Sequence, residues 1–544
     1  MQQKNIVRLG YLSLFAAWAF DQLFWQKAPG ISFFIFILLC LAVGFYLTWI
    51  ERLKPPVTSL LLLLPVTVFA ALTFLRVEPL SRMISYTYTL GSMLLLAMSW
   101  LGGSWWRYNL SDHIRNLLLL AGNILVKPFA ILLPAFSQAE PVWGHAGAEV
   151  PTTPETAHSP GKGRASKVLP VFYGVLLALP VVTVLALLLS AADPIFSRFM
   201  RDVLEFIRLE RIGEYIFRVI YISIVALLIS GIYLYSLLKS RNEKVTGSGE
   251  SWLSPFLGWT EAIIVLASVN LLFLSFVIIQ FQYFFGGGEN IRIDGFTYAE
   301  YARRGFNELV TVAVISLLIF LTLSMITRRD LGKPSRIFSV LGITLVALVA
   351  VMLMSAYQRL LLYEAAYGFS RIRTYSHVFM IWLGLLLAAT VFLEGTRRLR
   401  FFALAAILCG LGFGLTLNLI NVDGFITNQN VRRAVQEFEL DASYLTQLSD
   451  DAVPVMFELY NSGWLPQDVR DQLGSVLACR AAMAVRSPVH EAWPSYQVPR
   501  SRAIFLYREN QAILESYQLS EVDGRRMALI NGIEIRCDLT HWLD

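Results

Sequence analysis

The sequence predicts an all-α polytopic membrane protein with about eleven transmembrane helices and a small α-helical soluble domain at its C-terminus. Between residues 9 and 420 it contains about eleven apolar segments, each long enough to cross a bilayer. A hydrocarbon core about 30 Å thick requires roughly 20 apolar residues as helix, because no water there can satisfy unpaired backbone groups. The composition agrees, since 56% of the residues are hydrophobic and only 15% are charged. The clearest segments are residues 31–50, 57–75, 168–190, 212–238, 259–284, 306–327 and 337–357.

The first segment is an uncleaved helix rather than a signal peptide. Lys4 and Arg8 precede an apolar run over residues 9–25, but no small-residue cleavage site follows it. Further apolar segments come at once. Residues 1–103 are therefore predicted to form an N-terminal block of four transmembrane helices.

Residues 104–137 suit an interfacial or re-entrant amphipathic segment better than a span. They contain aromatic, basic and helix-breaking residues, namely Trp105, Trp106, His113, Arg115, Lys127 and Pro128. Residues 138–167 are rich in Pro, Gly, Ala, Ser and Thr, which predicts a flexible cytoplasmic linker. Residues 168–420 then form a predicted block of seven transmembrane helices.

The distribution of basic residues predicts the orientation. If residues 104–137 lie on the surface, the cytoplasmic connections carry 20 Lys and Arg residues against 14 on the other side. If they cross instead, the counts become 17 and 16, and Lys127 is left inside a span. The positive-inside rule favours the first arrangement, with a cytoplasmic N-terminus and an extracytoplasmic C-terminal domain in a cell inner membrane. The crossing arrangement remains open.

Charged residues gather in two connections that would then face outward, at residues 286–305 and 358–376. They form a candidate ionic cluster of Glu300, Arg303, Arg304, Glu308, Arg359, Glu364, Arg371 and Arg373. One interpretation is a pocket for a zwitterionic or anionic headgroup, because Arg binds phosphate in a bidentate manner. The other is a collar of salt bridges that fixes the helix ends. Both interpretations remain open.

No motif predicts a metal, a cofactor or a nucleotide. The six histidines are scattered, and neither HExxH, CxxC nor GxxxxGK[ST] occurs. His377 lies near the outer end of a span, where it is either a hydrogen-bonded interfacial residue, a proton carrier or a metal ligand. Few ionisable residues fall well inside the spans, which argues against an ion-coupled pump.

The tail, residues 421–544, predicts an extracytoplasmic α-helical domain. It contains 17 acidic residues and 11 Arg but no Lys. Helical spacing of apolar residues predicts helices over residues 431–448, 452–460, 466–484, 501–517 and 520–530, with Asp450 or Asp451 as a helix cap. Residues 533–543 alternate and predict one short strand. Cys479 and Cys537 could form a disulfide in an oxidising compartment, although sequence alone leaves their pairing open.

Several phrases of the sequence are similar to a known family. DGFTYAEYARRGFNEL (residues 294–309) and RLLLYEAAYGFSRIRTY (residues 359–375) resemble the bacterial integral-membrane family called domain of unknown function 4173, which is similar to the 4153 family. Residues 192–196, 418–430 and 440–454 add to the resemblance. It implies the membrane class and the organisation of residues 168–544. It implies no activity.

Three functions follow from these features as hypotheses. The first is a non-enzymatic role in envelope assembly, sensing or partner binding, with membrane lipids and another envelope protein as partners of the C-terminal domain. The second is a transporter or flippase for a lipid-like or hydrophobic substrate. The third is a membrane enzyme acting on a lipid headgroup through loop carboxylates. No nucleic-acid partner is expected, because no binding motif occurs and Arg residues form no run longer than a pair.

Overall fold

The fold is described from a computed structural model of the chain. It describes residues 3–132, 189–190, 193, 196, 209–242, 255–285, 306–328, 333–436, 438–484, 492–522, 525–530 and 533–537. The chain divides into two compact units, Met1–Lys127 with Leu227–Asp544, and Pro128–Ala226. The second unit is described chiefly by the first half of one helix, and the first unit contains the rest of the fold.

Among the described residues, eight helices are long and apolar enough to cross a membrane, which confirms the predicted all-α membrane class. Seven are α2 (Ile31–Ile50), α9 (Leu209–Leu238), α10 (Trp259–Phe285), α13 (Phe306–Ile326), α14 (Lys333–Tyr367), α15 (Arg371–Gly395) and α16 (Phe402–Ile420). The eighth candidate span is made of two consecutive helices, α3 (Val57–Leu60) and α4 (Leu63–Leu75).

Two further helices have a less apolar sequence but lie among these. They are α1 (Gln3–Phe24), which packs against α2, and α5 (Pro79–Ser99), which packs against α4. The expected number of about eleven includes both of them and residues 168–190, nearly all of which lie outside the described residues.

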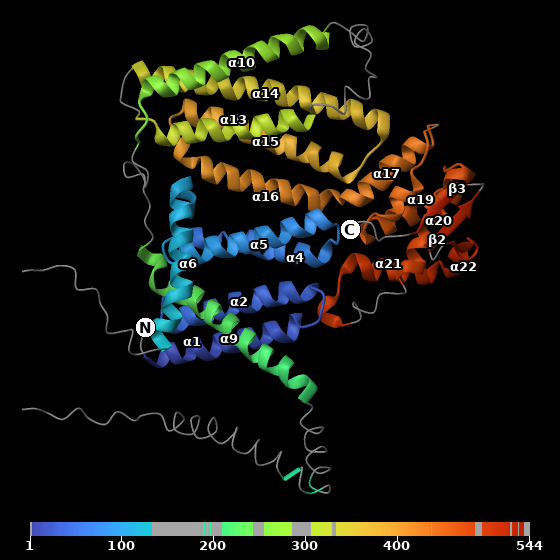
Figure 1. Cartoon of the computed structure of the whole chain (residues 1–544), viewed down its shortest axis with the longest axis horizontal. Coiled ribbons are helices and arrows are strands. Elements are labelled where there is room, and N and C mark those ends of the chain that lie inside the picture. Colours follow the sequence, from blue (N-terminus) through green and yellow to red (C-terminus); the bar gives the residue numbers. More distant parts are fainter. Residues whose placement is uncertain are drawn as a thin grey trace, which may run out of the picture. The chain divides into compact units, whose positions relative to one another are not determined.

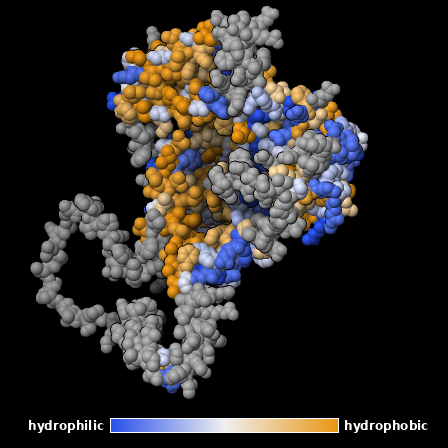
Figure 2. All heavy atoms as spheres, turned by 45° about the vertical axis from the view of Figure 1, so that its right-hand side comes forward, coloured by the Kyte–Doolittle hydropathy of each residue, from blue (hydrophilic) through white to orange (hydrophobic). Residues whose placement is uncertain are grey.

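The tail lies at one end of the membrane helices (Figure 1). The backbone N–H of Ile31, at the start of α2, donates to the carbonyl of Tyr496 at 3.0 Å. Gly30 is required at this contact, because a Cβ there would lie 2.5 Å from the carbonyl carbon of Ser495. Figure 2 shows hydrophobic residues over the helices and hydrophilic residues over the tail.

Several other connections of the chain meet at the opposite end of the helices. The Trp106 and Phe401 rings stack there with centroids 6.3 Å apart, and the Leu101 N–H donates to the Ser240 hydroxyl at 3.0 Å. Three short 3-10 helices lie at this end: η1 (Trp105–Arg107), η3 (Ser240–Asn242) and η4 (Leu399–Phe401). The basic residues described there include Arg52, Lys54, Arg107, Lys239, Arg241, Arg328, Arg397, Arg398 and Arg400.

Residues 104–137, predicted to be interfacial or re-entrant, contain helix α6 (Leu110–Leu132). In Figure 1 this helix runs across the direction of α4 and α5 rather than alongside them. Its Leu120 packs with Leu96 and Trp100 from the end of α5 and the turn that follows it. Its position relative to a bilayer stays a prediction.

Helix α16 packs between α5 and α15 and contacts both of them through small residues. A Cβ on Gly414 would lie 2.5 Å from a ring carbon of Tyr88 on α5, and one on Gly412 would lie 2.1 Å from the Trp382 ring on α15. Small residues at such positions allow helix backbones to approach closely. Larger side chains there would separate α16 from its neighbours.

The prediction that residues 358–376 form an outward-facing connection is wrong. Helix α14 continues to Tyr367 and α15 begins at Arg371, so only three residues connect them. Gly368 makes the turn with a φ of 78°, a conformation that Gly adopts without steric cost. The helix continues through its polar residues because side chains of neighbouring helices bond to them.

The tail packs six helices around one core. These are α17 (Val422–Ala434), α18 (Ala442–Thr446), α19 (Val453–Tyr460), α20 (Gln467–Ala484), α21 (Val498–Glu509) and α22 (Gln511–Glu515), with 3-10 turns η5 (Asp450–Ala452) and η7 (Trp493–Ser495). Leu445, Met456, Leu473 and Val476 are fully buried in that core. The helices expected at residues 452–460 and 466–484 are confirmed, whereas the one expected at residues 431–448 is split into α17 and α18.

The helix expected at residues 520–530 is wrong. That segment belongs to an antiparallel sheet of β1 (Leu519–Val522), β2 (Arg525–Ile530) and β3 (Ile533–Arg536), in which Leu519 pairs with Ala528 and Ala528 with Ile535. The dipeptides Asp523-Gly524 and Asn531-Gly532 stand between the strands. Such pairs are the strongest short-range signal for a hairpin, and they outweigh the helical spacing.

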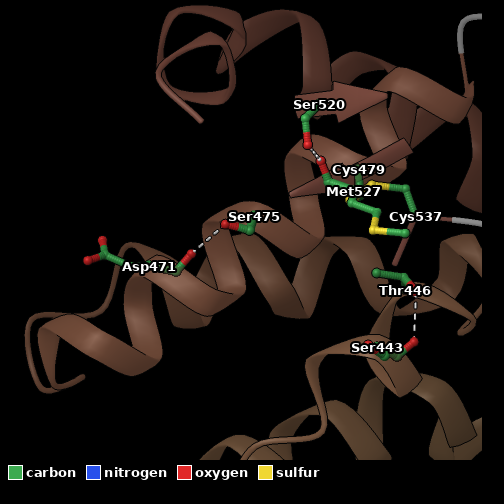
Figure 3. The surroundings of a disulfide bond; sticks show 8 residues. All are labelled: Ser443, Thr446, Asp471, Ser475, Cys479, Ser520, Met527 and Cys537. Atoms are coloured by element: carbon green, nitrogen blue, oxygen red, sulfur yellow. Dashed lines mark hydrogen bonds between the residues drawn. A yellow bond between two sulfur atoms is a disulfide. The ribbon is translucent and has the colours of Figure 1, made fainter. Parts of the chain in front are cut away.

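A disulfide ties the sheet to the helices of the tail (Figure 3). Cys479 of α20 and Cys537, which follows β3, are bonded, with their Cα atoms 5.1 Å apart. Both side chains are buried, close to the carboxyl end of α18. The bond closes a loop of 58 residues.

Candidate functional site

The structure concentrates buried charge where the tail meets the membrane helices, and we call this region the joint. It is formed by the start of α5, the start of α15, the α16–α17 turn and the residues around η5. Its charged members are Arg76, Glu78, Arg371, Asp423, Asp450, Asp451 and Arg480.

The turn between α16 and α17 positions the first carboxylate of the joint. Asn421 has a φ of 53°, a left-handed conformation that Asn tolerates better than most residues. Its side-chain carbonyl accepts from the Gly424 N–H at 3.3 Å, and its amide donates to the Asp451 carbonyl at 3.0 Å. Asp423 follows within the first turn of α17 and is completely buried.

Arg371 and Asp423 form a bidentate ion pair. The guanidinium Nε and Nη2 donate to the two carboxylate oxygens at 2.8 and 2.6 Å. The Ser449 N–H adds a third bond to Asp423 at 2.6 Å, while the Arg371 N–H donates to the Tyr444 hydroxyl at 2.9 Å. The pair therefore connects α15, α17 and the segment before η5. Buried pairs of this geometry fix one arrangement of the elements that carry them.

Asp451 forms the next link of the joint. Its carboxylate accepts from the backbone N–H groups of Val77 and Glu78 at 2.7 and 2.8 Å, and Arg76 lies 3.4 Å away. Neither Asp450 nor Asp451 caps α19 as expected, because η5 runs directly into that helix and Ala452 is its N-cap residue, with no side-chain cap. Burial raises the pKa of the Asp451 carboxyl, against the opposing effect of the N–H groups and Arg76.

Glu78 completes the joint at the start of α5. Its carboxylate caps the helix by accepting from the N–H groups of Leu80 and Ser81 at 3.0 and 2.7 Å, and it also accepts from the Tyr375 hydroxyl. Pro79 follows as the first helical residue, a position that suits a residue without an N–H. The carboxylates of Asp423, Asp451 and Glu78 are thus each held by three or more donors, an arrangement that serves structure rather than proton transfer.

The predicted ionic cluster lies partly outside the described residues. Glu300, Arg303 and Arg304 fall in residues 286–305, which the structure does not describe. Glu308 is exposed in the first turn of α13. Arg371 belongs to the joint instead, where its partner is Asp423.

The remaining predicted residues take different partners. Arg373 lies over the Tyr363 ring at 4.1 Å and donates to the carbonyls of Tyr367 and Gly368, which closes the turn between α14 and α15. Arg359 is buried and donates to the side-chain carbonyl of Gln280 on α10 at 2.8 Å.

Glu364 and His377 form a buried pair between α14 and α15. The His377 Nε2 lies 2.6 Å from one Glu364 carboxylate oxygen, and Tyr357 packs edge-on against the His377 ring. The other carboxylate oxygen is buried without a hydrogen-bond partner among the described residues. Ionisable groups in spanning helices are costly and are commonly functional. The pairing of Glu364 with His377 was not predicted.

Three cavities lie in or beside the tail. One of about 810 Å³ is lined by α20, η7, α21 and β1. A second of about 490 Å³ lies between the tail and the start of α5. A third of about 410 Å³ lies beside the α16–α17 turn. They place possible binding volume at the tail end of the bundle.

Sequence reasoning missed most of the joint. Asp423 and Glu78 were not singled out, and Asp451 was expected only as a cap. Two signals were available: Glu78-Pro79 directly before a helix, and a lone carboxylate just after the last span. Neither signal identifies the residue that the carboxylate contacts, and in each case that residue lies more than 50 positions away in the sequence.

Comparison with known proteins places the chain in a family. Among the residues that the structure describes, no group of three or more His, Cys, Asp or Glu residues could hold a metal ion. No curated protein and no solved structure shows significant similarity to the chain. A family described as Domain of unknown function (DUF4153) matches residues 9–459, which is most of the chain and ends within α19. The chain therefore belongs to the DUF4153 family, a family similar to the one that its sequence phrases resemble.

Proposed function

We propose that this chain is a non-enzymatic inner-membrane protein whose extracytoplasmic tail binds a partner at the envelope. The observation that carries the proposal is the joint, which holds the tail on the membrane helices through buried carboxylates that each accept three or more hydrogen bonds. Such an anchor costs free energy to build, and it supports a surface that must be presented in a fixed position. Acid–base catalysis is disfavoured because the carboxylates of Asp423, Asp451 and Glu78 are buried and already accept several hydrogen bonds from the protein.

The proposed orientation rests on charge and on aromatic residues. The basic residues at the end of the helices opposite the tail suit a cytoplasmic face, as the positive-inside rule requires. Trp493 and Tyr496 of the tail are exposed beside the start of α2, where amphipathic rings favour the headgroup layer. The tail would then rest on the outer surface of the membrane.

Site-specific photo-cross-linking in intact cells tests the partner. A photoreactive residue at Phe505, which is 63% exposed on α21, should give one discrete protein adduct. The same residue at Trp493 should give lipid adducts, and at the exposed Asp468 it should give neither. Only lipid adducts at Phe505, or the same protein adduct at Asp468, would contradict the proposal.

Thiol labelling tests the orientation independently. In a chain with Cys40 and Cys409 replaced, a cysteine at the exposed Asn461 should react with an impermeant reagent in intact cells. A cysteine at the exposed Thr396, at the other end of the bundle, should react only after the membrane is opened. The reverse pattern would show that the tail is cytoplasmic.

A second function is favoured by the Glu364–His377 pair. An ionisable pair buried between spanning helices, with one carboxylate oxygen unpartnered within the described part of the chain, is the kind of feature that a transporter or flippase for a lipid-like substrate uses. In vesicles containing the purified chain, Glu364→Gln should then slow lipid scrambling at least about ten-fold, whereas Glu308→Gln should not. Vesicles that scramble lipid no faster than empty ones would exclude this function.

A further inference from the structure

The cavity of about 490 Å³ between the tail and the start of α5 has an excess of positive charge. Its lining includes three guanidinium groups, those of Arg82, Arg480 and Arg500, and one carboxylate, that of Asp450. Arg480 already pairs with Asp450 at 3.0 Å and donates to the carbonyls of Thr446 and Leu448. The side chains of Arg82 and Arg500 form no hydrogen bond or ion pair with another residue that the structure describes.

Buried donors point to a missing acceptor in the same cavity. Tyr507 is 7% exposed, and its hydroxyl lies beside the Arg480 guanidinium, which can donate to the hydroxyl oxygen. The hydroxyl proton has no acceptor within the described part of the chain. Arg500 also interacts electrostatically with the Tyr507 hydroxyl. Buried polar groups are almost always bonded, so donors left over in a charged cavity indicate a ligand that accepts hydrogen bonds.

The geometry points to a binding site for a phosphate group in this cavity, held by Arg82 and Arg500 with the Tyr507 hydroxyl. Guanidinium groups bind phosphate through two parallel N–H···O bonds, and several donors converging on one volume match its oxygen atoms. A carboxylate would satisfy fewer of these donors. The inference does not depend on a protein partner for the tail, and either proposal can fail alone.

The phosphate has two possible sources, an anionic lipid headgroup or a free anion. Arg82 lies one turn into α5, at the outer end of a membrane helix. Met83 and Leu90 are exposed and lie within about 100° of Arg82 around the helix. They provide an apolar surface for acyl chains below the cavity. The lipid is therefore the source that we expect.

Native mass spectrometry and lipid titration of the full-length chain in a non-ionic detergent test the site. Phosphatidylglycerol should bind more tightly than phosphatidylcholine, with one high-affinity site. Arg500→Gln and Arg82→Gln should each weaken that site about ten-fold to a hundred-fold, since each removes charge-assisted bonds. Arg502→Gln, an exposed neighbour on α21 that does not line the cavity, should leave the affinity unchanged.

A second variant separates binding from folding. Tyr507→Phe keeps the packing of the ring and should weaken the site by about three-fold to ten-fold. Inorganic phosphate that displaces the lipid, or binds in its place, would assign the site to a free anion. Lipid binding that inorganic phosphate does not affect would assign it to the headgroup. The inference is overturned if neither probe binds, or if Arg82→Gln and Arg500→Gln bind phosphatidylglycerol as Arg502→Gln does.

Discussion

Replacing Asp423 by Asn removes the charge of the ion pair at the joint while keeping the shape of the side chain. Asp423 is completely buried and Arg371 is 20% exposed at its side chain. Removing one partner of a buried pair costs about 3–5 kcal/mol, because the other charge is left uncompensated. Arg371 retains some solvent and the Gln447 carbonyl at 3.3 Å. We therefore expect Asp423→Asn to lower the free energy of unfolding by about 3 kcal/mol, at the bottom of that range.

A double-mutant cycle with Arg371→Gln measures the pair itself. Urea unfolding in detergent, followed by the fluorescence of the tail tryptophans, gives the four free energies. The double variant should be less destabilised than the sum of the two single variants by about 2 kcal/mol, a value within the range for contacting charges. Glu509→Gln, an exposed control in α21, should change stability by less than about 0.5 kcal/mol. Additive effects of Asp423→Asn and Arg371→Gln, or a cost of Asp423→Asn below about 1 kcal/mol, would refute the reasoning.

Three further predictions concern the tail and its attachment. Replacing Cys479 and Cys537 by Ser should lower the free energy of unfolding by about 2–4 kcal/mol, because the bond closes a loop of 58 residues. Dithiothreitol should lower it similarly in the native chain. Unchanged stability after either treatment would contradict the prediction. Gly30→Val should destabilise by about 1–3 kcal/mol and increase proteolysis of the tail, since its side chain would collide with Ser495; proteolysis at the native rate would contradict it. The pKa of Asp451 is raised by burial, so the folded state binds more protons than the unfolded state, and this group makes stability fall as the pH rises through the carboxyl range. Asp451→Asn should flatten that fall in urea unfolding as the pH rises above the ordinary carboxyl range, and an identical pH profile would count against the assignment.

The sequence predicts the membrane helices well because their signal is local. Residues 31–50 and 259–284 are predominantly apolar, and α2 and α10 begin where expected and end within one residue of the expected position. The end of the segment expected at residues 337–357 was ten residues short, since Arg359 and Glu364 read as loop residues. They remain helical because Gln280 and His377, on other helices, bond to them. Polar residues in helices thus depend on partners that one segment cannot reveal.

The candidate site was less predictable for the same reason. Arg371 was singled out, but its partner Asp423 is 52 residues away, and the partner of Arg76 is 375 residues away. Charge and periodicity locate such residues near a helix end without identifying what they meet. The hairpins after Leu519 are a different case, because the pairs Asp523-Gly524 and Asn531-Gly532 are local signals in the sequence that indicate hairpin turns.

The contact between Gly30 and Ser495 has a consequence for biosynthesis. Helix α2 leaves the ribosome more than four hundred residues before the tail segment that contacts its first residue, Ile31. The Asp451 carboxylate, which accepts from the Val77 and Glu78 N–H groups, is likewise made 373 residues after Glu78. Contacts of such separation form late. The early helices are therefore inserted in the bilayer before the tail that covers their ends has been made. A chain truncated before Tyr496 would contain these helices but would lack the contact that the tail makes with α2.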